Sequence, residues 1–290
     1  MLGFIARRAW GSVLTLFFII TVSFFMVRLA PGGPFSAERS FPPEVLRQLE
    51  AQYDLDKPML TQYWLYMKRV VFQFDLGPSS RYADRSVNAL IAEKIPISLT
   101  LGFGALAVAL LVGLFAGLLA ALNHNKALDY VPMGLAMVGV SIPDFVMGYI
   151  LVIIFAINLQ WFPAATIESW DGFVLPWVTL GLVYAASIAR LTRGGMLETL
   201  GQDYIRTARA KGLPEKVVLR RHSLQGGLLP LVSYLGPATA GILTGSIVIE
   251  NIFAIPGLGN LLIESATNPD YTLALGCVIV FAVFVIAYNF

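Results

Sequence analysis

Residues Leu101–Leu122 read LGFGALAVALLVGLFAGLLAAL, an unbroken run of apolar residues and glycines with no charged side chain. The run exceeds the ~20 residues that an α-helix needs to cross the hydrocarbon core of a bilayer. Within it, Gly113 and Gly117 form a G-x-x-x-G pair, a spacing that lets two membrane helices approach closely. This stretch therefore predicts a membrane-spanning helix that packs tightly against a neighbour.

The composition of the whole chain agrees with this prediction. Of its 290 residues, 57% are apolar and only 13% are charged, whereas about 25% of the residues in an ordinary soluble domain are charged. So few charges cannot cover the surface of a soluble protein of this length, and we interpret the chain as an integral membrane protein. The single cysteine, Cys277, excludes an internal disulfide and a cysteine-based metal cage.

Apolar runs long enough to cross a membrane occur six times, and together they predict an all-α, polytopic fold with six transmembrane helices. The first run resembles a secretory signal peptide, but it continues without an A-x-A cleavage site, so we interpret it as a retained span. The six runs are Ala9–Leu29, Ile97–Leu122, Tyr130–Leu159, Phe173–Ala189, Leu228–Ile249 and Thr272–Phe290, and the last of these reaches the final residue of the sequence.

The distribution of basic residues predicts the orientation of these spans. One side carries eleven Lys or Arg residues: two before the first span, Lys126 between spans two and three, and eight in the loop Arg190–Leu229. On the other side, the short loops Gln160–Gly172 and Glu250–Tyr271 carry none. Cytoplasmic loops hold the excess of basic residues, so we expect both termini to be cytoplasmic.

These runs divide the chain into a cytoplasmic N-terminus with the first span (1–30), an external, periplasmic cap region (31–96) and a core membrane domain with five spans (97–290). The cap region contains eight basic and eight acidic residues, but long loops cross the membrane largely regardless of charge. Its segment 41–74 predicts two short amphipathic helices separated at Asp56-Lys57-Pro58. Two interpretations remain open: a packing module on the outer face, or a docking surface for an external partner.

The largest basic loop contains the most distinctive motif, YIRTARAKGLPEKVVLRRHSLQGGLLP, over Tyr204–Pro230. A short helix is predicted over Asp203–Lys211, because an acid stands at its start and a lysine at its end. Gly212 stands where a left-handed C-terminal cap belongs, and a second helix is predicted from Glu215 to about Leu224 with Pro214 in its first turn. Two helices joined by a sharp turn would form a protruding elbow.

This elbow has two interpretations from its residues alone. It is either a basic surface loop that enforces topology and attracts anionic lipid, or a contact for another protein. The small residues Ala208, Ala210 and Gly212 favour the second interpretation, because they predict a thin helix face that enters a partner's groove.

The stretch RTARAKGLPEKVVLRRHSLQGGLLP resembles the EAA loop of ABC-type importer permeases, in the form found in the oligopeptide, dipeptide and nickel permease family. The resemblance covers nearly the whole chain and is closest to the oligopeptide-permease B-type branch. Arg206 and Thr207 replace the Glu and Ala of the general motif, and Gln225 replaces its Pro. Three further stretches carry the resemblance: FFMVRLAPGGPF (24–35), MGLAMVGVSIPDF (133–145) and IVIENIFAIPGLGNLLIESATNPDY (247–271).

The resemblance implies a type I ABC importer permease fold in a bacterial inner membrane, with the coupling loop 190–229 inside the core permease domain 97–290. It also implies a pathway lined by spans three to five and shared with a homologous second permease subunit, two ATPase subunits below, and an external solute-binding protein that delivers a short peptide. Glutathione and nickel are the alternative solutes, and nucleic acid is not expected as a partner. The implied contact with the ATPase consists of Arg206, Thr207, Ala208, Arg209, Ala210, Lys211, Gly212 and Leu213.

Chemistry within this chain is not expected. The sequence has no G-x-x-x-x-G-K-[ST] phosphate loop, so ATP and Mg would be bound by the partner ATPase subunits, and no cofactor or metal by this chain. His124 and His222 lie in predicted cytoplasmic loops, away from cysteines and paired carboxylates, which argues against catalysis and against an intramembrane enzyme. An ion-coupled secondary transporter would be expected to show several intramembrane ionisable residues and internal repeats, and neither is evident.

Three further residues or segments lie within or beside the predicted spans. Asp144 is the only acid predicted at membrane depth, but Ser141-Ile-Pro-Asp144 fits a capping box at a break in span three, and we prefer that structural role. Arg28 is expected to extend toward the outer membrane interface. The breaker-rich segment Ile255–Gly259 is either a plain turn or a re-entrant element at the mouth of the pathway.

Overall fold

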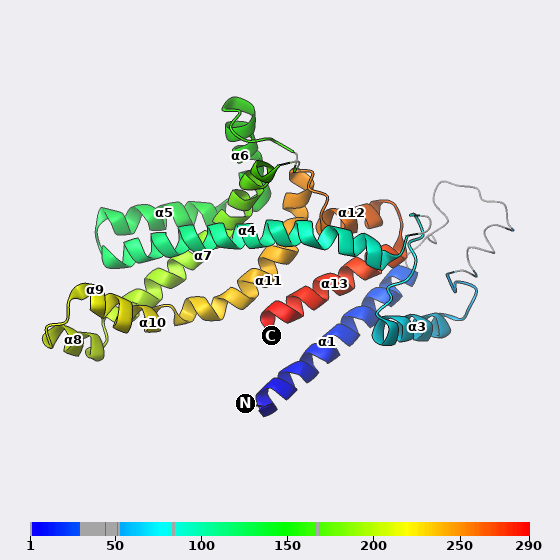
Figure 1. Ribbon diagram of the computed structural model, residues 1–290, viewed down its shortest axis with the longest axis horizontal. Coiled ribbons are helices and arrows are strands. Elements are labelled where there is room, and N and C mark those ends of the chain that lie inside the picture. Colours follow the sequence, from blue (N-terminus) through cyan, green and yellow to red (C-terminus); the bar gives the residue numbers. More distant parts are fainter. Residues whose placement is uncertain are drawn as a thin grey trace. The chain divides into compact units, whose positions relative to one another are not determined.

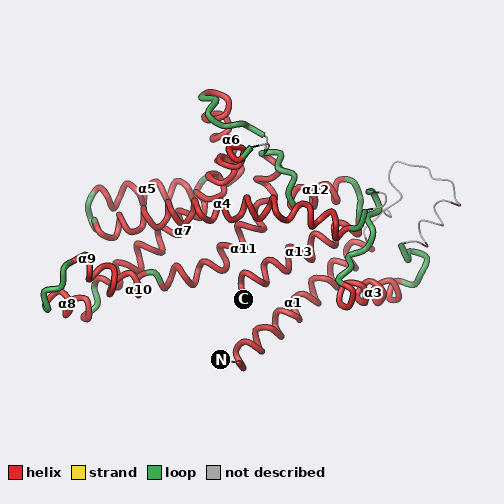
Figure 2. The backbone as a smooth tube through the Cα atoms, viewed as in Figure 1, coloured by secondary structure: helices red, strands yellow, loops and turns green. Residues whose placement is uncertain are grey.

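The computed structural model describes residues 2–29, 44, 51, 53–82, 85–165, 167 and 169–290. Helices make up nearly all of this part, and the strand-like pairing described in it is one isolated bridge between Pro78 and Ser86. Figures 1 and 2 show the succession of long and short helices along the chain. The all-α expectation is confirmed.

The chain divides into two compact units, with one boundary within helix α4 (Val87–Leu122) and another between Ile255 and Pro256. The first unit comprises Met1–Ile97 with Pro256–Tyr288 and Phe290, and the second comprises Ser98–Ile255 with Asn289. The first unit contains α1 (Leu2–Leu29), α3 (Met59–Lys68), the π-helix η1 (Arg69–Gln73), α12 (Leu258–Thr267) and most of α13 (Tyr271–Asn289). The second contains α5 (Ala127–Ser141), α6 (Asp144–Leu151), η2 (Val152–Asn158), η3 (Trp170–Phe173), α7 (Val174–Leu200), α8 (Asp203–Ala210), α9 (Glu215–Val217), η4 (Val218–Ser223), α10 (Leu224–Gly227) and α11 (Leu229–Ile252).

Among the described residues, five helices are long and apolar enough to cross a membrane: α1, α4, α7, α11 and α13, with α7 counted together with η3. A sixth span results if the bent pair Ala127–Ser141 and Asp144–Asn158 is counted as one. Each apolar run in the sequence therefore corresponds to a helix or to this pair. The helical nature of all six predicted segments is confirmed.

The third of these segments is not one continuous helix. Its two halves are bent by 107° at a break of two residues, where Ile142 is extended and Pro143 precedes the first turn of α6. Proline has no N–H to donate and disfavours helical geometry in the residue before it, so a helix ends here. The predicted break is confirmed at this proline.

The predicted capping box at this break is wrong. The Ser141 hydroxyl donates to the Met137 carbonyl at 2.9 Å, within its own helix, and so it does not cap α6. The Asp144 carboxylate accepts from the N–H of its neighbour Phe145 at 2.8 Å. Asp144 thus stands in the first turn of α6, where the helix dipole favours an acid, without the reciprocal bond to Ser141.

Two helices extend well beyond the apolar runs that predicted them. Helix α4 begins at Val87, before the expected start at Ile97, and contains Pro96 within its length. Helix α7 continues past Ala189 to Leu200. Hydrophobicity marks only the part of a helix that lies in lipid, whereas helix formation continues into water wherever the residues permit it. The predicted loop 190–229 therefore consists largely of helix.

Helices α4 and α7 pack so closely in the second unit that their backbones touch. A Cβ atom added to Gly113 would lie 2.7 Å from the Ala185 carbonyl oxygen, and one added to Gly117 would lie 2.6 Å from the Ala189 carbonyl oxygen. From the other side, a Cβ atom added to Gly181 would lie 2.8 Å from the Ala105 carbonyl oxygen. Real Cβ atoms do not approach that closely, so these positions require glycine. The predicted glycine packing of Leu101–Leu122 is confirmed.

In the first unit, two acids hold the loop before α4 against the C-terminal helices. Asp270 caps α13 by accepting from the Leu273 N–H at 3.0 Å, and its second oxygen accepts from the Ser79 hydroxyl at 2.5 Å. The Tyr82 hydroxyl donates to Glu264 on α12 at 2.6 Å, and this bond raises the pKa of Tyr82. These contacts hold residues 79–82 against α12 and α13.

The cap region is described in part. The second predicted amphipathic helix is present as α3 and η1, and it begins at Met59, directly after Pro58. The first predicted helix falls mostly on residues outside the described ranges. The segment Ile255–Gly259 forms a short connection, because α12 begins at Leu258 and Gly257 stands at its N-cap.

Candidate functional site

The predicted elbow exists and consists of two helical segments joined by a tight turn. Its first segment is α8, and its second is the uninterrupted helical run α9–η4–α10; together they occupy residues 203–227, which we call the elbow. Figure 1 shows α8, α9 and α10 together at the end of α7 that lies farthest from α6. The elbow thus connects the last turn of α7 to the start of α11.

The turn of the elbow is a Schellman motif centred on Gly212. The Gly212 N–H donates to the Arg209 carbonyl at 2.9 Å, and the Leu213 N–H donates to the Ala208 carbonyl at 3.3 Å. This pattern satisfies two of the carbonyl groups that a helix end leaves free. Gly212 has a φ of +79°, so the predicted left-handed cap is confirmed. Pro214 is the N-cap residue of α9, which starts at Glu215, and so it stands just before the first turn in which it was predicted.

An ion pair spans this turn. The Arg209 guanidinium donates from Nη2 to Glu215 Oε1 at 2.7 Å and from Nε to Oε2 at 3.1 Å. The paired hydrogen bonds raise the pKa of Arg209 and lower the pKa of Glu215. Both side chains are exposed, so water screens the pair and its contribution to stability is small. Its two-point geometry is compatible with one orientation of the two segments about the turn.

A small apolar core holds the two segments of the elbow together. Ile205 and Ala208 from α8 pack against Val218 from η4, and all three side chains are buried. Ala208 is only 6% exposed, so the prediction that it presents a small face to a partner's groove is wrong. Alanine is required here because the second segment of the elbow lies directly against α8.

The other predicted contact residues reach the surface. All seven are exposed at the tip of the elbow: Arg206, Thr207, Arg209, Ala210, Lys211, Gly212 and Leu213. The basic character of this surface is reinforced by Lys216, Arg220 and Arg221, which are also exposed. Seven of the eight predicted residues are therefore accessible on α8 and the turn that follows it.

The base of the elbow is joined to α7 by direct backbone contact. A Cβ atom added to Gly195 would lie 2.2 Å from the Gly227 carbonyl oxygen, and one added to Gly227 would lie 2.5 Å from the Met196 sulfur. An interface packed this closely resists sliding. We therefore expect the base of the elbow and the end of α7 to move together. The glycine pairs 194–195 and 226–227 are visible in the sequence, but their mutual contact is not.

An ion pair that the sequence did not reveal lies two residues before this contact on α7, and its carboxylate is buried. Arg193 on α7 donates from Nε to Asp129 Oδ1 at 2.5 Å and from Nη2 to Asp129 Oδ2 at 2.8 Å. Asp129 stands in the first turn of α5 and is 1% exposed. Its carboxylate also accepts from the Asn125 N–H at 3.0 Å and lies 3.2 Å from His124 Nδ1. These contacts connect α5 to α7.

The two histidines lie in different surroundings. His124 contacts a single carboxylate, that of Asp129. His222 lies on η4 and is half-buried. In the part of the chain that the structure describes, no group of three His, Cys, Asp or Glu side chains has an arrangement that would hold a metal ion. The contact of His124 is therefore with a structural ion pair.

Asp144 is not the only acid in the helices that are long and apolar enough to cross a membrane. Glu250, which the sequence placed at the edge of an external loop, belongs to the last turn of α11 and is completely buried. The Ser98 hydroxyl on α4 donates to Glu250 Oε1 at 2.8 Å. A buried acid needs such partners, because an unpaired charge in an apolar surrounding is costly. Glu250 thus ties the end of α11 to α4.

Two family models match the chain: the binding-protein-dependent transport system inner membrane component over residues 113–290, and the N-terminal part of that membrane component over residues 1–102. The chain belongs to this family. As a member of this transport family, it is a non-catalytic, multi-pass permease subunit of an ABC importer. The membership expected from the elbow motif is confirmed.

Individual relatives match this permease subunit over nearly its full length. It is 51% identical to the oligopeptide transport system permease protein OppB of Escherichia coli strain K12 over 284 residues, which cover 96% of this chain and 92% of that protein. It is 43% identical to the dipeptide transport system permease protein DppB of Bacillus subtilis, over 99% of this chain and 92% of that protein.

A solved structure supports the fold. The crystal structure of an amino acid ABC transporter with histidines is similar to the permease subunit with a TM-score of 0.55, over 70% of this chain and 90% of that one. Sequence identity is 19%, so this likeness bears on the fold alone. The predicted type I ABC importer fold is confirmed.

Proposed function

We propose that this permease subunit forms half of a pathway for short peptides and that its elbow is the coupling element for cytoplasmic ATPase subunits. The elbow carries the proposal, because seven of its predicted contact residues are exposed around a turn rigidly joined to α7. Peptide as the solute rests on the oligopeptide and dipeptide permease proteins to which the chain is similar. Glutathione and nickel are the alternatives.

The proposed assembly contains a homologous second permease subunit, two ATPase subunits that bind ATP and Mg, and an external solute-binding protein. It lies in the bacterial inner membrane with both termini of this chain in the cytoplasm. When the ATPase subunits close, they would displace the elbow, and the Gly195–Gly227 contact would pass that displacement to α7. The Asp129–Arg193 pair would pass it on to α5. Access to the pathway would then switch from one side to the other.

The function is tested with purified components in liposomes. We expect the complete assembly to hydrolyse ATP faster when a peptide-loaded binding protein is added, and to accumulate peptide. The permease subunit alone should do neither, because ATP is bound elsewhere in the assembly. Glutathione and nickel, each with its own binding protein, serve as the substrate controls. Uptake by the isolated chain driven by an ion gradient would contradict the proposal and would favour a secondary transporter.

Orientation is tested by labelling introduced cysteines from one side. Ser169 and Lys216 are exposed and lie on opposite sides of the predicted membrane topology, whereas the native Cys277 is buried. Ser169→Cys should react with an impermeant thiol reagent added outside intact cells, and Lys216→Cys only after the membrane is opened. The reverse pattern would overturn the assignment of both termini to the cytoplasm.

A further inference from the structure

We propose that α3 and η1 form an interfacial anchor that lies in the outer leaflet of the membrane and inserts an aromatic edge among the lipids. The partner is the lipid bilayer at its boundary between headgroups and acyl chains. The proposal concerns the cap region only and does not depend on the elbow or on the substrate.

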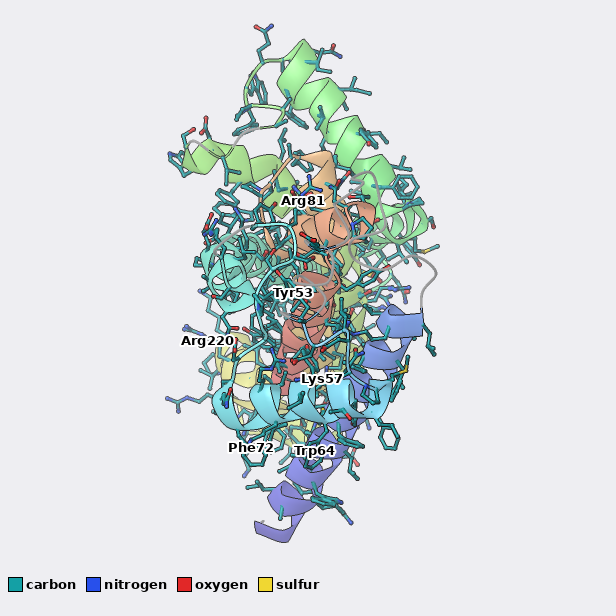
Figure 3. The ribbon with its side chains drawn as sticks, turned by 90° about the vertical axis from the view of Figure 1, so that its right-hand side faces the viewer. Tyr53, Lys57, Trp64, Phe72, Arg81 and Arg220 are labelled. Atoms are coloured by element: carbon teal, nitrogen blue, oxygen red, sulfur yellow. The ribbon has the colours of Figure 1, made fainter. Side chains whose placement is uncertain are left out.

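The first observation is an apolar edge on α3 and η1 that is open to the surroundings. Leu60 and Trp64, four residues apart, share one face of α3, and they are 74% and 69% exposed. Phe72 on η1 is 76% exposed. Figure 3 shows Trp64 and Phe72 along one edge of the helix and Lys57 along the opposite edge. Large aromatic side chains this exposed mark a surface that contacts something apolar.

The second observation is that the other face of α3 packs against α1. The Tyr63 ring stacks on Phe25 with centroids 5.4 Å apart and meets Phe24 edge-on at the same distance. The Tyr63 hydroxyl is hydrogen-bonded to the Thr21 hydroxyl at 2.7 Å. Tyr66, which is buried, lies against Phe24 with centroids 5.6 Å apart. The depth of α3 is therefore fixed by the depth of Thr21, Phe24 and Phe25.

The third observation places that contact within the membrane. The charged residues of α1 are confined to Arg7 and Arg8 near its start and Arg28 near its end. The intervening apolar segment Ala9–Val27 is about 28 Å long, close to the ~30 Å thickness of the hydrocarbon core. Along the helix axis, Thr21 lies about 10 Å inside Arg28 and Phe24 about 6 Å inside it. Interfacial helices place their apolar face about 5–10 Å into the boundary between headgroups and chains.

Helix α1, against which α3 packs, also has an exposed apolar stripe. Phe18, Val22 and Met26, spaced four residues apart, form an exposed apolar stripe on α1 at the same depth. Tryptophan is enriched at membrane interfaces, where its ring is accommodated between headgroups and chains. At the opposite edge, Lys57 pairs with Asp54 at 2.6 Å and lies where water and headgroups are available. Lipid is thus the occupant that fits both edges of the helix.

The test measures what surrounds spin labels in the complete transporter reconstituted in liposomes. Trp64→Cys and Phe72→Cys are labelled, with Phe18→Cys as the lipid-exposed control and Lys57→Cys as the water-exposed control. Relaxation by molecular oxygen, which concentrates in lipid, is compared with relaxation by a water-soluble nickel chelate. At 64 and 72 we expect the oxygen-to-nickel ratio to match that at 18 and to exceed that at 57 several-fold.

Two outcomes would overturn the proposal. Greater access of the nickel chelate at 64 and 72 would place this edge in water. Protection from both reagents would show that protein covers it, either the second permease subunit or the external binding protein. Each labelled variant should reach the membrane and co-purify with its partner subunits in the same amount as the unlabelled protein, which shows that the assembly is intact.

Discussion

Gly212→Val is expected to lower peptide-stimulated ATP hydrolysis by the complete transporter about tenfold or more, while the permease subunit still reaches the membrane. The φ of +79° at this position costs a residue with a Cβ about 1–2 kcal/mol, and a β-branched residue more. Beyond the neighbouring residues of the chain, no atom lies within 4 Å of the position that a Cβ would occupy, so the Cβ itself meets no steric obstacle and the penalty lies in the backbone conformation. The second segment of the elbow would leave the turn in a different direction. Insertion should be unaffected, because it depends on the apolar spans.

The matched control is Gly212→Asn, because asparagine adopts left-handed conformations more readily than other residues with a Cβ. It should retain most of the stimulated hydrolysis although its side chain is similar in size to valine. Lys216→Ala, beyond the turn, should have little effect. Equal loss in the valine and asparagine variants would show that bulk at the surface matters, and not the backbone of the turn. Full activity in both would leave the elbow without a coupling role.

Ala208→Trp is a less informative variant. A tryptophan in place of a groove-facing alanine would block docking through bulk alone, but Ala208 is packed against Val218. A tryptophan there would force α8 away from η4 and disrupt the elbow itself. Its phenotype therefore cannot be assigned to docking, and Gly212 is the better position for a test.

Asp129→Ala is expected to destabilise the permease subunit by about 1–3 kcal/mol, because it removes both hydrogen-bond acceptors of Arg193, whose side chain is 28% exposed and can be hydrated in part. The N–H of Asn125 would lose its acceptor as well. The measurements are thermal unfolding of the purified assembly and the amount of peptide imported per ATP hydrolysed. Asp129→Asn, which preserves shape and one acceptor, should be milder in stability but should still import less peptide per ATP.

The double variant Asp129→Asn with Arg193→Gln separates the pair from its single residues, because it removes both charges together. We expect it to recover most of the lost stability. Arg190→Gln is the matched control, since Arg190 is an exposed cation on the same helix, about one turn away. If the double variant recovers stability and also recovers normal peptide import per ATP, the pair is structural only. If Arg190→Gln lowers stability and peptide import per ATP as much as the single variants do, the loss comes from removing any positive charge from α7 and not from breaking the Asp129–Arg193 pair.

The sequence was sufficient for the features that depend on local residue type. Apolar runs located the six segments, and Gly212 followed by Pro214 located the turn, since each signal lies within a few neighbouring residues. The ends of α4 and α7 could not be predicted in this way, because hydrophobicity reports where lipid begins and not where the helix ends.

Features that depend on contacts between distant residues were missed. Asp129 and Arg193 are 64 residues apart, and Asp129 follows Lys126 in what looks like a solvated loop. Ala208 illustrates a different limit: small residues are needed both where a helix meets a partner and where it meets its own chain. Only the position of η4 decides between these two cases.

The glycine contacts of α7 determine how many independent movements the second unit has. At Gly113, Gly117 and Gly195, α7 contacts the backbone of a neighbouring helix, α4 or α10. Such close packing resists relative movement of the helices. We therefore expect α4, α7 and α10 to move as one rigid body. The flexible degree of freedom in this unit is then expected at the break between Ile142 and Pro143, where continuous helical hydrogen bonding stops. If the angle between α5 and α6 changes at this break, displacement of the elbow would lead to rotation of α6 relative to α5.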